Sequence, residues 1–276
     1  MQHPAIPLAG SAHPGMEHPY TRYVALGDSF TEGVGDEEPD LPNGVRGWAD
    51  RVAEELARTR PDFQYANLAI RGRLLGQIEA EQLEPAIALD PDLVTISAGG
   101  NDLIRPGGDP DALAARLDEI VGRLRARGAE VVLFNGPDIA MTPVLRTIRG
   151  KVGIYNANLF GVAAKHGAVI ADMWSARQLQ QPQMWAPDRL HFSHYGHHEI
   201  AMLVLDALGV EHSLTHMEPE PLPVRTRQQM AMENLHWARE HLAPWVVRRL
   251  RGQSSGDTIS PKRPQAAPVL PLHHDD

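Results

Sequence analysis

Three residues of this chain have the types and the spacing that nucleophilic catalysis needs. Ser29 lies in the segment GDSFTEG, residues 27–33, and Asp188 and His191 stand three residues apart. Serine is a weak nucleophile until a base takes its proton, and an imidazole oriented by a carboxylate is such a base. One tight turn can bring the Asp188 carboxylate to Nδ1 of His191 and leave Nε2 facing Ser29. These residues indicate acyl transfer through a Ser-His-Asp triad.

Acyl transfer also needs hydrogen-bond donors for the negative oxygen of its tetrahedral intermediate. The backbone N–H groups of Ser29 and Gly72 and the side-chain amide of Asn101 could converge as such donors. A glycine at position 72 lets the backbone approach a substrate closely. Asp102, the neighbour of Asn101, is interpreted as a turn former.

The elements that must position these residues alternate between strand and helix. Five apolar runs followed by polar clusters predict strands, and helical spacing separates them, which indicates a parallel sheet covered on both faces. In such a sheet ligands bind beyond the carboxyl ends of the strands, where the candidate residues lie. The expected strands cover residues 23–27, 63–69, 93–98, 131–135 and 168–173, and the expected helices cover residues 47–59, 75–89, 110–127, 148–166 and 195–208.

Four of these segments together resemble the conserved blocks of the GDSL, or SGNH, hydrolases. GDSFTEG is similar to block I, Gly72 to the block II glycine, residues 99–102 (GGND) to block III and residues 188–191 (DRLH) to the block V DxxH. The resemblance covers roughly residues 22–208. It implies a flavodoxin-like three-layer α/β/α sandwich with a five-stranded parallel sheet, and it implies neither a metal nor an organic cofactor.

The same resemblance assigns roles to the residues. It implies Ser29 as the nucleophile, His191 as the base and Asp188 as the partner of His191, with Ser29, Gly72 and Asn101 forming the oxyanion hole. Phe30 stands where the family name has leucine, and we expect it to pack rather than to react.

The function expected from these residues is hydrolysis of a small-molecule carboxylic ester through an acyl-enzyme. An acyltransferase would use the same triad with an alcohol in place of water. A non-catalytic binding protein that retains the fold is the alternative from another class. Short-chain esters, acetylated sugars and lysophospholipids all stay open as substrates.

Two further patterns could suggest other chemistry. Residues 252–256 (GQSSG) match the GxSxG nucleophile motif with Ser254 at its centre, but no strand is predicted before them, and the motif needs one. His194, His197 and His198 lie near one helical face, as metal ligands could, yet no acidic or thiolate partner is evident. We interpret these histidines as exposed residues at the start of a helix.

Composition narrows the class of protein. The chain has 276 residues, 42% of them hydrophobic, and a net charge of −9, which argues against a general nucleic-acid binder. The absence of cysteine excludes disulfides and thiolate nucleophiles. No run approaches eighteen consecutive apolar residues, and the first twenty residues do not resemble a signal peptide. We expect a cytoplasmic protein without a membrane span, and the oligomeric state is not predicted.

The hydrolase domain, expected over residues 21–209, is flanked by segments of different character. Residues 1–20 predict a flexible arm, and residues 210–251 predict a linker followed by an amphipathic helix over 225–242, packed on the core or on a second subunit. From residue 225 onward, eight Lys and Arg face five Asp and Glu, so this end is locally basic. Residues 252–276 lack apolar periodicity and predict a disordered tail whose removal leaves activity intact.

Overall fold

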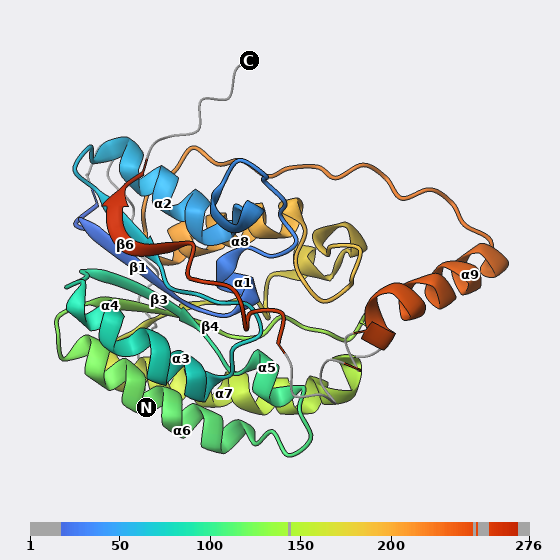
Figure 1. Cartoon of the computed structure of the whole chain (residues 1–276), viewed down its shortest axis with the longest axis horizontal. Coiled ribbons are helices and arrows are strands. Elements are labelled where there is room, and N and C mark those ends of the chain that lie inside the picture. Colours follow the sequence, from blue (N-terminus) through green and yellow to red (C-terminus); the bar gives the residue numbers. More distant parts are fainter. Residues whose placement is uncertain (1–17, 143–144, 245–246, 248–253, 270–276) are drawn as a thin grey trace, which may run out of the picture.

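A six-stranded sheet forms the middle layer of the protein (Figure 1). The computed structural model describes residues 18–142, 145–244, 247 and 254–269, so most of the expected N-terminal arm lies outside the described residues. The strand order is β5-β4-β3-β1-β2-β6; the first five strands are parallel, and β6 is antiparallel to β2. The strands are β1 (Arg22–Gly27), β2 (Gln64–Asn67), β3 (Leu93–Ser97), β4 (Glu130–Phe134), β5 (Val169–Ala171) and β6 (Arg263–Pro268).

Helices cover both faces of this sheet, as predicted. On one face lie α2 (Gly47–Thr59) and α8 (His194–Ala207), and on the other lie α3 (Leu75–Ile78), α4 (Glu84–Ala88), α6 (Pro110–Arg125) and α7 (Arg149–His166). In β1, the side chains of Tyr23 and Ala25 enter the core under α2 and α8, whereas Val24 and Leu26 enter the opposite core. Burial on both faces is the property of a central parallel strand.

The expected helix over residues 75–89 is divided by a π-helical turn, Glu79–Leu83. This turn aims the buried side-chain amide of Gln82 at the end of β1. There Nε2 donates to the carbonyl oxygen of Gly27 at 2.8 Å, and Oε1 accepts from its N–H at 2.9 Å. A π-turn inside a helix commonly marks a functional position. Here it fixes the backbone two residues before Ser29.

The prediction of a disordered tail from residue 252 is wrong for residues 254–269. Arg263–Pro268 form β6, which adds a sixth strand to the five that were expected. Before it, Nζ of Lys262 is buried and donates to the carbonyl oxygens of Arg46 at 2.7 Å and Val45 at 3.3 Å, and pairs with Asp50. Apolar periodicity gave no sign of this attachment, because backbone pairing and one buried ion pair provide it.

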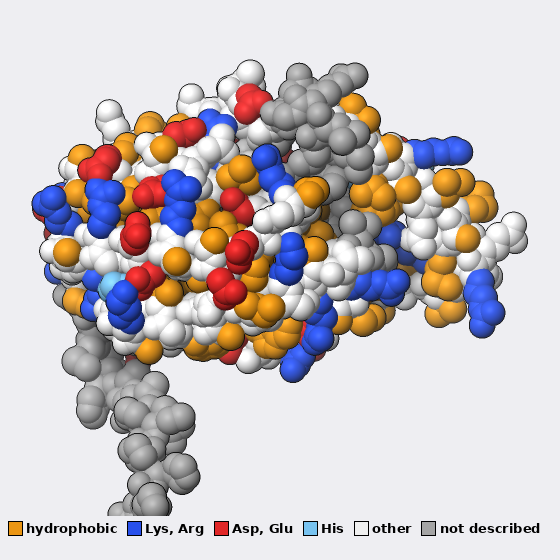
Figure 2. Space-filling model, turned by 90° about the horizontal axis from the view of Figure 1, so that it is seen from below, with side chains coloured by type: hydrophobic (Ala, Val, Ile, Leu, Met, Phe, Trp, Pro, Cys, Tyr) orange, Lys and Arg blue, Asp and Glu red, His pale blue; other side chains and the backbone are white. Residues whose placement is uncertain are grey.

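The C-terminal helix α9 (Arg227–Trp237) projects from the body of the protein, with its C-terminal end against it (Figure 1). No residue of α9 is buried, and Met232 is 65% exposed. Hydrophobic side chains gather on this projecting part of the surface (Figure 2). Of the two expected positions for this helix, on the core or on a second subunit, the structure contradicts packing on the core. Among the described residues no helix is long and apolar enough to cross a membrane.

Candidate active site

Ser29 lies where the order of the strands reverses. It is the first residue of the short helix α1 (Ser29–Glu32), directly after β1, and β1 lies between β2 and β3. Open parallel sheets bind ligands at such a point. The turn into α1 requires glycine at position 27, since φ is 154° there and a Cβ would lie 2.8 Å from the carbonyl oxygen of Ser97.

Asp188 and His191 form the tight turn that their spacing predicts. Oδ2 of Asp188 lies 2.5 Å from Nδ1 of His191, and Oδ1 accepts the backbone N–H groups of Leu190 and His191 at 3.0 Å each. Burial alone would raise the pKa of Asp188, but the hydrogen bonds and charge of His191, together with these N–H groups, lower it to about 2. The carboxylate therefore stays ionised and holds the imidazole with Nε2 free to act as a base.

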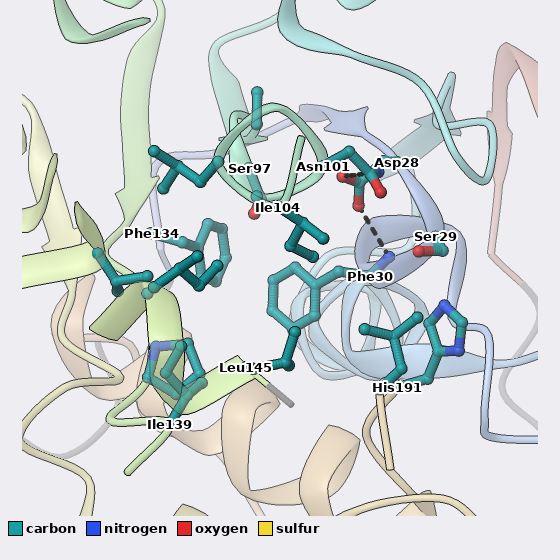
Figure 3. Close-up of a pocket in the computed structure, with 18 of the residues that line it drawn as sticks. Asp28, Ser29, Phe30, Ser97, Asn101, Ile104, Phe134, Ile139, Leu145 and His191 are labelled. Atoms are coloured by element: carbon teal, nitrogen blue, oxygen red, sulfur yellow. Dashed lines mark hydrogen bonds between the residues drawn. The ribbon is translucent and has the colours of Figure 1, made fainter. Parts of the chain in front are cut away.

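The Ser29 side chain and the His191 ring line one pocket and lie next to each other (Figure 3). Ser29 comes from the end of β1, and His191 from the loop before α8. The structure thus brings the three predicted catalytic residues together, because Asp188 contacts the imidazole that shares a pocket with Ser29. Such an arrangement can transfer a proton from a hydroxyl to a substrate leaving group.

Asn101, in α5 (Gly100–Leu103), lines the same pocket. Its Nδ2 donates to Oδ2 of Asp28 at 2.9 Å and to the carbonyl oxygen of Arg73 at 3.2 Å. Burial raises the pKa of Asp28 to about 6, against the opposing effects of the Phe30 N–H, the charge of His191 and the Asn101 amide. These two hydrogen bonds fix the Asn101 amide in the pocket that Ser29 also lines.

Gly72 also lines the pocket, in a loop held from two sides. The fully buried Glu32 accepts the backbone N–H of Arg71 at 2.7 Å and pairs with its guanidinium. On the other side, Oγ of Ser254 donates to the carbonyl oxygen of Arg71 at 3.3 Å. With φ of 78°, Gly72 adopts a left-handed conformation, and a Cβ on it would collide with Ser254.

Glu32 and Ser254 hold the loop that carries Gly72, and the sequence alone does not predict this role for either residue. Glu32 is the glutamate of GDSFTEG, so its place beside the nucleophile was visible, but its buried pairing with Arg71 was not. In the sequence, Ser254 stands out only as the centre of a GxSxG pattern. The structure gives it partners in the Gly72 loop instead, and Ser254 and Ser255 both line the pocket.

The pocket has a volume of about 260 Å³ and is lined mostly by apolar side chains, with Arg105 and Asn135 among its polar residues. Phe30 packs as expected, with its ring 5.4 Å from those of Trp48 and Phe134. Figure 3 shows apolar side chains that extend the pocket away from Ser29, among them Ile104, Phe134, Ile139 and Leu145. The apolar lining also includes Leu103, Ile148, Val152 and Trp185.

The histidines of α8 are held separately rather than around one point. His197 is buried, contrary to the expectation of exposed histidines, and its Nδ1 accepts the backbone N–H of Trp48 at 3.2 Å. Nε2 of His198 lies 2.7 Å from the carbonyl oxygen of Thr215, and His194 pairs with Asp36. Across the part of the chain that the structure describes, no three His, Asp or Glu residues group as metal ligands would.

A comparison with known proteins matches the region of the chain that contains Ser29, Asp188 and His191. The model of the GDSL-like Lipase/Acylhydrolase family matches residues 25–199, and no curated protein matches. Among solved structures, LAE5, an alpha/beta hydrolase from the metagenome of Lake Arreo, aligns with a TM-score of 0.60 and 24% identity over 70% of this chain and 97% of its own.

Two further structures are similar. A catalytic mutant of Axe2, an acetylxylan esterase from Geobacillus stearothermophilus, has a TM-score of 0.60 and 23% identity over 71% of this chain and 98% of its own. TesA has a TM-score of 0.57 and 23% identity over 68% and 97%. At these identities the likenesses establish a shared fold.

Proposed function

This chain belongs to the GDSL-like lipase/acylhydrolase family and is a carboxylic-ester hydrolase, and we propose that it works through an acyl-enzyme on Ser29. The observation that carries the proposal is the 2.5 Å contact between Asp188 and His191 in a turn whose imidazole faces the pocket of Ser29.

In the first half-reaction, Nε2 of His191 takes the proton of Ser29 as Oγ attacks the ester carbonyl carbon. The new negative oxygen accepts hydrogen bonds from the backbone N–H groups of Ser29 and Gly72. It also accepts one from the Asn101 amide, which exchanges its longer bond, to the carbonyl oxygen of Arg73, for the oxyanion. His191 then gives its proton to the departing alkoxide, which leaves as the alcohol. In the second half-reaction water attacks the acyl carbon, His191 takes its proton, and Ser29 leaves with that proton as the acid is released.

A fluorophosphonate probe tests this assignment. We expect one covalent label per chain, mapped by peptide sequencing to Ser29, and a strongly slowed reaction in His191→Ala. A label on Ser254, or labelling that His191→Ala leaves as fast as before, would exclude the proposed triad. An absence of both labelling and ester hydrolysis would favour a binding protein, and faster product formation with added alcohols would favour an acyltransferase.

Of the substrates left open, the pocket favours esters whose acyl part is an alkyl chain. Its walls beyond Ser29 are apolar, and burial of each CH₂ group contributes about 0.8 kcal/mol. An acetyl group would leave most of this surface without contacts. We therefore expect kcat/KM for p-nitrophenyl esters to rise about fourfold per added CH₂ until the pocket is filled.

A paired substitution tests the acyl pocket. Ile104→Trp should shift the best substrate to shorter acyl chains, because Ile104 lines the pocket and a larger ring occupies its volume. Ile154→Trp is the matched control, since Ile154 lies on α7 and is 50% exposed. A chain-length profile that Ile104→Trp leaves unchanged would contradict the acyl-pocket assignment.

A further inference from the structure

The Asp188–His191 turn contains a residue in an unfavourable conformation. Arg189 has a φ of 57°, in the left-handed region that side chains with a Cβ rarely adopt. The Asp188 carboxylate accepts the backbone N–H groups of Leu190 and His191, and the N–H of Arg189 donates to the carbonyl oxygen of Ala186 at 2.9 Å. Such a conformation persists only where the surroundings impose it, and these hydrogen bonds leave the carbonyl oxygen of Asp188 and the side chain of Arg189 to contacts from outside the turn.

Those contacts come from the end of α9. Nε1 of Trp237 donates to the backbone carbonyl oxygen of Asp188 at 3.0 Å. The guanidinium carbon of Arg189 lies 5.0 Å from the centre of the Trp237 ring, within cation–π range, and NH1 of Arg189 donates to Oδ1 of Asn234 at 2.7 Å. One helix end thus contacts both the backbone of the catalytic aspartate and the strained residue that follows it.

Three observations indicate that the end of α9 serves to hold the turn of residues 188–191. Asn234 and Trp237 lie outside residues 25–199, the part matched by the family model. No residue of α9 is buried, so the helix adds no core surface that would explain its attachment. Immediately after Trp237 the helix widens into a π-helical turn, Ala238–Leu242, a feature frequent at functional positions.

We propose that Trp237 is a positioning residue for the catalytic turn, acting through the backbone of Asp188 and the side chain of Arg189. This inference rests on the proposed triad. When Trp237 holds residues 188 and 189, the Asp188 carboxylate keeps its place against His191, and Nε2 of His191 stays aimed at Ser29. His191 moves protons only as the transition state forms, so looser positioning lowers kcat and leaves KM nearly unchanged.

Two substitutions at position 237 test this role in the full chain. Trp237→Phe keeps a ring beside Arg189 but removes the N–H donor, and Trp237→Ala removes both contacts. We expect kcat to fall about 10- to 100-fold in Trp237→Ala and by a smaller factor in Trp237→Phe, with KM within about twofold of the parent value. Labelling of Ser29 by a fluorophosphonate should slow in the same order, while the melting temperature stays near that of the parent.

Controls separate this proposal from the one on which it rests. Met232→Ala changes a 65% exposed residue of the same helix and should leave kcat and labelling unchanged. If His191→Ala abolishes activity but Trp237→Ala keeps the parent kcat, the positioning role is wrong and the triad stands. If His191→Ala retains activity, the triad itself is wrong. A rise in KM alone in Trp237→Ala would also overturn the positioning role.

Discussion

Two regions of this molecule meet at one pocket, yet they are held in place by different forces. In the predicted hydrolase domain, residues 21–209, the helix α2 has eight of its thirteen residues buried. In the C-terminal extension, residues 210–269, α9 has none of its eleven residues buried, and β6 is mostly exposed. The domain is stabilised by a large buried area shared among many side chains. The extension is held by the pairing of β6 with β2, by a few polar contacts and by a small number of partly buried apolar side chains such as Val210 and Val269. Single substitutions there should therefore have concentrated effects.

The largest expected effect separates two of the serines that line the pocket, Ser29 and Ser254, one from each region. Ser29→Ala should lower kcat by about 10⁴- to 10⁶-fold, because it removes the nucleophile, and should leave the melting temperature nearly unchanged. Ser254→Ala should lower kcat by at most about tenfold, because Ser254 contacts only the backbone of the Gly72 loop, through the carbonyl oxygen of Arg71. Steady-state hydrolysis of one ester by both variants measures the contrast. Equal losses would mean that the two regions share the chemistry.

The next effect concerns stability and compares two lysines. Lys262→Met should lower the free energy of unfolding by about 3–5 kcal/mol, because it leaves the carboxylate of Asp50 buried without its partner. Lys165→Met, where the side chain is 62% exposed in its pair with Asp118, should cost at most about 1 kcal/mol. Urea unfolding measures both.

Truncation of the chain after Arg251 tests the attachment of β6 to the sheet. It removes Lys262 together with β6, so we expect it to destabilise the protein at least as much as Lys262→Met does. The expectation from sequence was that this truncation is harmless. A truncated chain with parental stability would restore that expectation and reduce β6 to a dispensable strand.

The next prediction concerns Asn101, whose contribution to kcat comes from the hydrolase domain alone. Asn101→Ala should lower kcat by about 10²- to 10³-fold with little change in KM, because an oxyanion donor matters only as charge develops. Asn158→Ala is the matched control, since its amide donates to Asp111 on the exposed faces of α7 and α6. Slow labelling of Ser29 by a fluorophosphonate should persist in Asn101→Ala. A change in KM alone would make Asn101 a substrate-binding residue.

The smallest effect is a pH dependence of stability in the turn that both regions contact. The pKa of Asp188 is lowered to about 2 in the folded protein, so its contribution is complete above its ordinary value near 3.8 and is lost as the pH falls towards 2. Asp188→Asn should therefore unfold with a shallower dependence on pH between 4 and 2. The lowering of the pKa of Asp188 from 3.8 to about 2 corresponds to about 2 kcal/mol of stability at most, at 1.36 kcal/mol per pKa unit. Acid titration followed by circular dichroism checks it, and an unchanged slope would contradict it.

The same contrast explains what sequence could predict. The five parallel strands and their helices follow from apolar periodicity, because burial imposes that periodicity on the chain. The proposed triad could be predicted from residue types, since Ser29 follows a strand and Asp188 and His191 are near in sequence. Trp237 and Ser254 contact the backbone of distant residues, Asp188 and Arg71, and backbone partners leave no mark on residue type. Lys262 is one of three lysines in the chain, and nothing in its sequence neighbourhood distinguishes it until its burial is seen.

The pairing of β6 with β2 also has a consequence for the order in which the protein is made. Gln64 pairs with Pro268, so the partner of β2 leaves the ribosome long after β2 itself. Until then the edge of β2 exposes unpaired backbone groups, which are a template for strands of other chains. Once β6 has added, the new edge carries Pro264 and Pro268, which have no N–H to donate. The last strand therefore closes the sheet with an edge that resists further strand addition, and a chain arrested before it would be prone to aggregate.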